Sequence, residues 1–196
     1  MRLAFFVFSF FSFCYPDKNN YLSDEWFEKD VTLPQFLSFV QKFNGSLSTS
    51  NQVALYNAAK KYRINPVFVS AIMQCESGAI CQKVSPVTLS RAMGYGVMDH
   101  GNHGFDKQVE RGCWLLRKCF DGYYVGAVVE HQRAPWVKER KYLYPENAAT
   151  YARMVYCPVE ADYIEHDKNG VPYRCGGNVV FERVNFWFQK VFEGMI

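Results

Sequence analysis

The chain has 196 residues, which is the length of one large domain or two small ones. Because 49% of the residues are hydrophobic and 17% are aromatic, the chain can bury a core, and this composition excludes an intrinsically disordered protein. The net charge is only +3, and the basic residues form no long runs, so the composition gives no support to a nucleic-acid partner.

Residues 1–14 predict an export segment. Arg2 is followed by an apolar run over residues 3–13 that only Ser9 and Ser12 interrupt. A membrane-spanning helix needs about 20 apolar residues, so this run is too short to cross a bilayer, but it suits the hydrophobic region of an export signal. We therefore expect a protein of the periplasm or cell envelope. The alternative is a buried N-terminal helix or strand.

Cys14 stands where the apolar run ends and a polar segment begins. A lipid on this cysteine would attach the protein to a membrane, although Phe13 is bulky at a position where lipoprotein signals prefer a small residue. Signal cleavage and lipidation of Cys14 are both left open.

The other cysteines are even in number, which fits disulfides in an exported chain. Cys113 and Cys119 lie on one predicted helix, where six residues rise about 9 Å and turn about 240°, so they are not expected to bond to each other. No C-x-x-C pair occurs and the histidines lack zinc-site spacing, so no metal is expected. The six are Cys75, Cys81, Cys113, Cys119, Cys157 and Cys175.

Six cysteines can be joined into three disulfides in 15 ways. The single disulfide that the sequence supports best is the one between Cys157 and Cys175. The segment between them contains Asn169-Gly170, a turn signal that predicts a closed, hairpin-like excursion.

The first half of the chain predicts three helical regions. Residues 23–43 form one with Ser23 as its cap, and Pro34 breaks or restarts it. Residues 44–50 are a linker, so residues 15–49 are expected to be an appendage to a domain over 50–196. Ser50 is expected to cap a second helix that runs through Tyr62, and a third begins at Pro66 and stops at Gly78.

The second half begins with a stretch over residues 84–104 that is rich in glycine and turns. A helix over 105–120 follows, then one from Pro145 to Tyr156, and Asn178 can cap a last one. These patterns predict a mainly α fold.

Glu76 is the unusual residue of the third helix. Phe68, Ile72 and Glu76 are spaced i, i+4 and i+8, so a carboxylate shares a stripe with two core residues. Both desolvation and the helix dipole at a C-terminal turn are expected to raise its pKa, as a general acid for a glycosidic oxygen requires. The alternative is a glutamate that swings into solvent or pairs with Arg91 or Lys60.

Three segments in order, NPVFVSAIMQCESG, RAMGYGV and GFDKQV, resemble the lysozyme-like superfamily of peptidoglycan-cleaving enzymes, which includes lytic transglycosylases and endo-β-N-acetylglucosaminidases. The resemblance covers about residues 50–192. It implies an α+β lysozyme-like fold, with a helical domain and a small loop or β-hairpin region beside a glycan-binding cleft. Glu76 matches the catalytic acid and Ser77 the serine that follows it. The chain departs from the family at Asp99, where transglycosylases carry glutamine after Met98, so the subfamily stays open.

Asp99 and Asp106 are the candidates for the second carboxylate that a glycosidase normally needs. A lytic transglycosylase needs none, because one glutamate serves as acid and then as base while the sugar closes a 1,6-anhydro ring. Asp99 can equally cap the turn. Tyr95 lies between two glycines, and its ring suits stacking on sugars. The expected site is completed by Tyr156 as a third catalytic residue, and by Ser77, Tyr95, Gly96, Met98, Gln108 and Tyr151 as substrate-binding residues.

We therefore expect an exported monomeric enzyme that cuts β-1,4 bonds in the glycan strands of peptidoglycan without metal or organic cofactor. Which bond it cuts, and whether it hydrolyses the bond or forms anhydro ends, the sequence leaves open. The competing hypothesis is a catalytically silent lysozyme-like module that binds cell-wall glycan or a protein partner.

Overall fold

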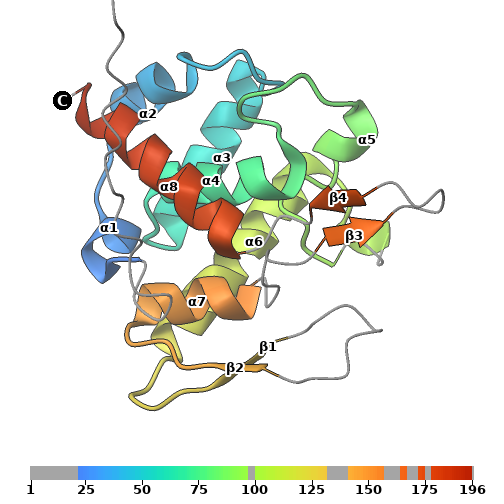
Figure 1. Cartoon of the computed structure of the whole chain (residues 1–196). Coiled ribbons are helices and arrows are strands. Elements are labelled where there is room, and N and C mark those ends of the chain that lie inside the picture. Colours follow the sequence, from blue (N-terminus) through green and yellow to red (C-terminus); the bar gives the residue numbers. More distant parts are fainter. Residues whose placement is uncertain are drawn as a thin grey trace, which may run out of the picture.

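The computed structural model describes residues 22–96, 100–131, 141–156, 164–166, 172–174 and 178–195. These residues form eight α-helices, one 3-10 turn and four short strands, which confirms the mainly helical fold (Figure 1). Within this part of the chain no helix combines the length and the hydropathy that crossing a membrane requires. The export segment over residues 1–14, with Cys14, lies outside the described residues.

The first predicted helix is two helices, α1 (Asp24–Glu28) and α2 (Leu33–Val40). Ser23 caps α1 as predicted, since its hydroxyl accepts a hydrogen bond from the Trp26 N–H at 3.3 Å. Pro34 lies in the first turn of α2, where its missing N–H needs no partner, so the break falls just before it.

The next two helices are α3 (Thr49–Lys61) and α4 (Pro66–Ser77). The prediction that Ser50 caps α3 is wrong. The Ser48 hydroxyl accepts the Asn51 N–H, so the helix starts two residues earlier than predicted. Asn65 caps α4, and Gly78 ends it in the left-handed conformation with φ +73°, as the sequence predicted.

The second half contains α5 (Pro86–Leu89), the 3-10 turn (His100–Asn102), α6 (Phe105–Asp121), α7 (Ala148–Tyr156) and α8 (Asn178–Glu193). The predicted helix over 105–120 is confirmed as α6. The helix predicted from Pro145 begins later, at Ala148, because the Asn147 side chain accepts the Thr150 N–H at 2.8 Å.

Two antiparallel hairpins complete the structure: β1 (Val129–His131) with β2 (Lys141–Leu143), and β3 (Ile164–His166) with β4 (Pro172–Arg174). The β3–β4 pair lies between Cys157 and Cys175 and agrees with the predicted hairpin-like excursion. Both of those cysteines lie outside the described residues, so their disulfide stays a prediction. The β1–β2 hairpin was not predicted.

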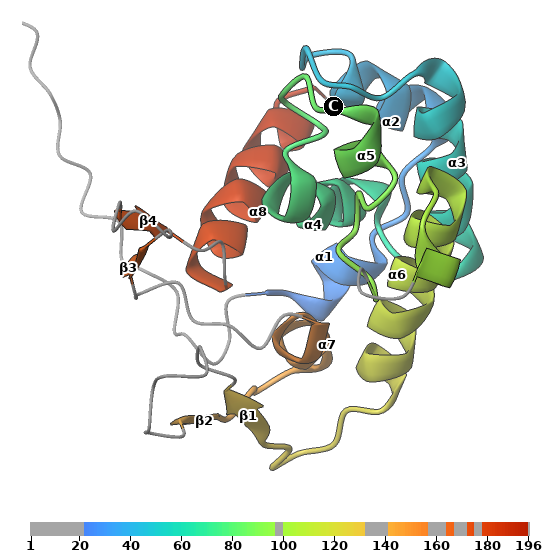
Figure 2. The same cartoon turned by 90° about the vertical axis from the view of Figure 1, so that its right-hand side faces the viewer.

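Helix α4 lies at the centre, between α8 and α3 (Figures 1 and 2). Aromatic rings join the helices around it: Phe68 of α4 meets Phe181 of α8 with ring centroids 5.4 Å apart. From α1, the ring of Phe27 stacks on Phe120 of α6 at 4.4 Å. Residues 22–43, predicted as part of an appendage, therefore contribute to the same hydrophobic core as the rest of the chain.

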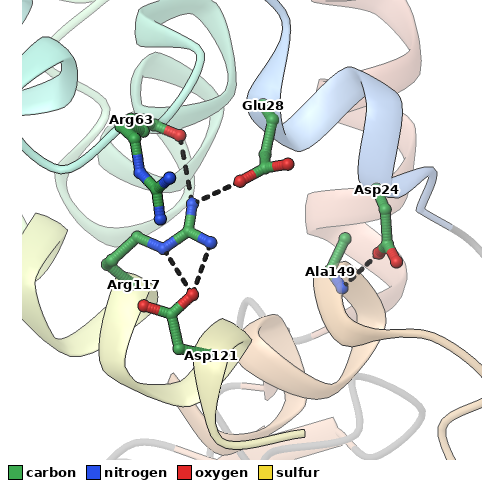
Figure 3. Close-up of polar contacts among 6 residues, drawn as sticks. All are labelled: Asp24, Glu28, Arg63, Arg117, Asp121 and Ala149. Atoms are coloured by element: carbon green, nitrogen blue, oxygen red, sulfur yellow. Dashed lines mark hydrogen bonds and ion pairs between the residues drawn. The ribbon is translucent and has the colours of Figure 1, made fainter.

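Polar contacts also hold α1 against the body of the protein (Figure 3). The Arg117 guanidinium on α6 donates to Glu28 of α1 at 2.7 Å and to Asp121 at 2.6 Å. The Asp24 carboxylate accepts the Ala149 N–H at the start of α7 at 2.8 Å. Helix α1 is thus linked to both α6 and α7.

Helix α6 is continuous, and its Cys113 and Cys119 do not bond to each other, as predicted. Among the cysteines that the structure describes, no two are joined by a disulfide, and Cys81, Cys113 and Cys119 carry free thiols. Burial raises the pKa of the Cys81 thiol to about 11. The expected disulfide framework is therefore not formed among these three residues.

Candidate active site

Glu76 lies where α4 leaves the core. Phe68 and Ile72, its partners on the stripe, are completely buried, as predicted. One turn further on, Glu76 is exposed on one side, because the helix ends at Gly78 and the chain turns away. The carboxylate thus stands at the boundary between a buried helix and the protein surface.

The open side of Glu76 faces a pocket of about 350 Å³. This volume is at the lower end of the range of ligand-binding pockets, about 300–1,000 Å³. The end of α4, helix α5 and the turns that follow α5 contribute its lining, which consists of Glu76, Ser77, Val87, Thr88, Arg91 and Gly94. Two of the predicted site residues, Glu76 and Ser77, are thus brought together in one pocket.

Desolvation by the surrounding protein raises the pKa of Glu76 above its ordinary value, as the sequence predicted. The positive charge of Arg153 acts in the opposite direction and lowers the pKa, but the desolvation is the larger effect. The alternative partners do not neutralise the carboxylate: Lys60 pairs with Asp30, and in the described residues no ion pair joins Glu76 to Arg91. Glu76 therefore holds its proton to a higher pH than a solvated glutamate.

Arg153 is a charged residue of the site that sequence reasoning missed. Its side chain is completely buried on α7, and its guanidinium carbon lies 4.6 Å from the centre of the Phe181 ring. One feature of the sequence could have identified it: Arg153 lies between Ala152 and Met154 on a helix whose other residues are mostly apolar. A buried cation near Glu76 makes the charge state of the two groups interdependent.

Gly94 forms the wall of the pocket next to Glu76. It has φ +69°, and a Cβ atom added to it would lie 2.6 Å from Glu76 Oε2. Its N–H donates to the Arg91 carbonyl at 2.9 Å, which closes the turn that carries both residues. The backbone conformation favours a glycine here, and a larger residue would also displace the Glu76 carboxylate.

Gln108 holds the loop that follows Gly94. Its amide is completely buried; Nε2 donates to the carbonyls of Tyr95 at 2.8 Å and Asn102 at 2.7 Å, and Oε1 accepts the Tyr95 N–H at 3.2 Å. Gly96 has φ +51° and packs against the Asn102 side chain. Predicted as a substrate-binding residue, Gln108 instead fixes the backbone at Tyr95, whose side chain is half-buried.

The two predicted tyrosines of α7 lie in different environments. The Tyr156 hydroxyl donates to the Met93 carbonyl at 2.5 Å, directly before Gly94, and Gly112 on α6 leaves room for this contact. Tyr151 packs on Tyr123, with ring centroids 5.7 Å apart, and does not line the pocket. Tyr156 thus supports the wall beside Glu76, and Tyr151 does not.

Ser77 lines the pocket, but its hydroxyl donates to the Met73 carbonyl at 2.9 Å. Asp106 is exposed in the first turn of α6. Met98 and Asp99 lie outside the described residues, so the roles predicted for them stay predictions. Within the described residues, no three His, Cys, Asp or Glu side chains are grouped as a metal site.

No protein-family model, no curated protein and no solved structure matches this chain.

Proposed function

We propose that this protein cleaves β-1,4-glycosidic bonds in the glycan strands of peptidoglycan, with Glu76 as the general acid and base. The observation that carries the proposal is a carboxyl group with a raised pKa on the wall of a surface pocket. A general acid must hold a proton near the working pH and must reach the reacting oxygen. The raised pKa of Glu76 and its place on the pocket wall support these two requirements.

In the first step the protonated Glu76 gives its proton to the glycosidic oxygen, and the bond from that oxygen to the sugar C1 breaks. The ionised carboxylate then takes a proton from the group that attacks C1. That group is the sugar's own C6 hydroxyl in a transglycosylase, which forms a 1,6-anhydro ring, or a water molecule in a hydrolase. Among the described residues that line the pocket, Glu76 is the one carboxylate, and the anhydro route needs no second one.

The proposal extends to the fold and the setting. The order of the motifs around Glu76, Gly94 and Gln108 supports a lysozyme-like arrangement, in which a helix ends at the acid and a glycine-rich loop forms the facing wall. The apolar run over residues 3–13 supports export to the cell envelope, where peptidoglycan lies. Signal cleavage and a lipid on Cys14 are both compatible with it.

The test is digestion of purified peptidoglycan sacculi by the wild type and by Glu76→Gln, with the released fragments identified by mass spectrometry. We expect the wild type to release muropeptides and Glu76→Gln to release none. Glu25→Gln, which changes an exposed carboxylate on α1, is the matched control and should act like the wild type. Anhydro ends identify a transglycosylase, and reducing N-acetylglucosamine ends identify a glucosaminidase.

A second candidate function is a catalytically silent module that binds glycan or a protein partner. The buried Arg153 favours this second function. A buried positive charge needs a compensating negative charge, and in a silent module the carboxylate of Glu76 would supply that charge and would not act as an acid. Equal, negligible release by the wild type and Glu76→Gln, together with sedimentation of both with sacculi, would select this function.

A further inference from the structure

A cation lines the same pocket as Glu76. Arg91 follows α5, and its N–H donates to the Thr88 carbonyl at 3.0 Å while its own carbonyl accepts the Gly94 N–H at 2.9 Å. These two turns place Arg91 between α5 and Gly94, which itself touches the Glu76 carboxylate. An acid and an arginine therefore share a pocket of about 350 Å³.

The charge of Arg91 is available to a ligand. Arg91 is exposed, and it forms no ion pair with any carboxylate in the part of the chain that the structure describes. This distinguishes Arg91 from Arg117, whose guanidinium is bound by Glu28 and Asp121. A guanidinium presents a fork of N–H donors that matches the two oxygens of a carboxylate.

The neighbours of Arg91 suit a sugar that carries such an acidic group. Val87 is 62% exposed and offers an apolar surface to the C–H face of a sugar ring. The Thr88 hydroxyl, which lies 3.0 Å from the Ser85 hydroxyl, adds a polar group on the same wall. The pocket thus combines a cation, an apolar surface and a hydroxyl next to the proposed acid.

We infer that Arg91 forms a carboxylate-binding subsite, so that the preferred substrate is a β-1,4 glycan bearing a carboxylate beside the bond that Glu76 protonates. This inference rests on the proposed function and specifies its substrate class. In peptidoglycan the carboxylate has two sources: the lactyl group of N-acetylmuramic acid in strands without peptides, and the acidic groups of the stem peptides in strands that carry them. A neutral chitin oligomer has neither.

The experiment measures binding by calorimetry in the Glu76→Gln background, so that no cleavage occurs. The probes are a neutral chitin tetramer, a peptide-free peptidoglycan tetrasaccharide and a peptide-bearing one. We expect a second substitution, Arg91→Gln, to weaken binding of a carboxylate-bearing probe by about tenfold or more, because glutamine cannot form the charge-assisted hydrogen bonds that a guanidinium donates to a carboxylate. Binding of the chitin tetramer should stay unchanged, and Arg91→Lys should retain part of the affinity.

Arg111→Gln is the matched control, because Arg111 is an exposed arginine on α6 that does not line the pocket. It separates recognition in the pocket from general attraction between a basic protein and an acidic glycan. A loss with the peptide-free probe identifies the lactyl carboxylate, and a loss with the peptide-bearing probe alone identifies the stem. Thermal melting of Arg91→Gln establishes that the fold is intact.

Two results would overturn the inference. In the first, Arg91→Gln binds both acidic probes as tightly as the protein that retains Arg91. In the second, Arg91→Gln loses as much affinity for the neutral probe as for the acidic probes. Both leave the proposed cleavage by Glu76 standing, because sacculus digestion measures it separately. If none of the three probes binds, the glycan substrate itself fails, and the proposed function fails with the subsite.

Discussion

The Glu76 carboxylate lies directly against the backbone of Gly94, so closely that a Cβ atom on Gly94 would come within 2.6 Å of Glu76 Oε2. The acid at the end of α4 and the turn after α5 therefore lie against each other, and the glycine leaves the space that the carboxylate occupies. No hydrogen bond or ion pair is needed for this relationship, since it depends on the absence of a side chain.

Gly94→Ala is expected to abolish most of the proposed glycan-cleaving activity, because the new methyl group displaces the Glu76 carboxylate from the wall of the pocket. Gly126→Ala is the matched control: Gly126 also has a positive φ, +89°, but an added Cβ meets nothing within 4 Å. Both variants should lose about 1 kcal/mol or more of unfolding free energy from backbone strain. Sacculus digestion measures the activity, and urea unfolding measures the unfolding free energy. Equal activity in the two variants would contradict a role for the contact between Gly94 and the Glu76 carboxylate.

Glu76→Gln is expected to raise the thermal stability at neutral pH. The folded-state pKa of Glu76 lies above its unfolded value, so ionisation costs stability as the pH rises from the unfolded pKa through the folded pKa. Glutamine does not ionise and escapes this cost. The melting temperature of Glu76→Gln should exceed that of the wild type above this window and approach it below the window. A lower melting temperature at neutral pH would mean that Glu76 acts mainly as the counter-charge of Arg153.

Arg153→Met is expected to raise the pKa of Glu76 further, since the charge of Arg153 lowers it. The high-pH limb of the activity profile should then move to higher pH, because the acid keeps its proton longer. Arg153→Lys retains the charge and should leave the limb near that of the wild type. Carbon-detected NMR titration of the Glu76 carboxyl gives the same comparison without activity, and an unchanged titration in Arg153→Met would exclude the coupling.

Gln108→Leu is expected to loosen the loop beside Glu76. The substitution leaves the Tyr95 N–H and the carbonyls of Tyr95 and Asn102 without their buried partner, which costs roughly 1–3 kcal/mol of unfolding free energy. The Tyr95 amide should exchange its hydrogen faster, as native-state exchange by NMR can show. Gln189→Leu changes a glutamine that is not fully buried, on α8, and should have a smaller effect on both quantities. An unchanged Tyr95 exchange rate would be evidence against the loop-holding role.

Local features of this fold could be predicted from the sequence because they depend on neighbouring residues. Ser23, Pro66 and Gly78 begin or end helices through hydrogen bonds and backbone angles within one turn, and the structure confirms all three. The errors in helix starts are also local: Ser48 and Asn147 cap their helices in place of the predicted starting points, Ser50 and Pro145. Before α3, Ser48 and Ser50 offer alternative caps that the sequence does not rank, and before α7 the side chain of Asn147 sets a start later than the proline suggests.

The candidate site was predicted in part. The stripe of Phe68 and Ile72 led to Glu76 and to the direction of its pKa shift, because the helical period links the three residues. The supporting contacts could not be predicted, since they join residues far apart in the chain. Tyr156 reaches Met93 across 63 positions, and the influence of Arg153 on Glu76 depends on how α7 packs.

The most direct test of the central claim is the rate at which purified sacculi are solubilised across the pH range by the wild type and by Glu76→Gln. We predict that the wild type releases glycan fragments at a rate that falls as the pH rises through the pKa of Glu76, and that Glu76→Gln releases none at any pH. Equal rates for the two proteins at every pH, or no release by a correctly folded wild type, would contradict the assignment of Glu76 as the catalytic acid.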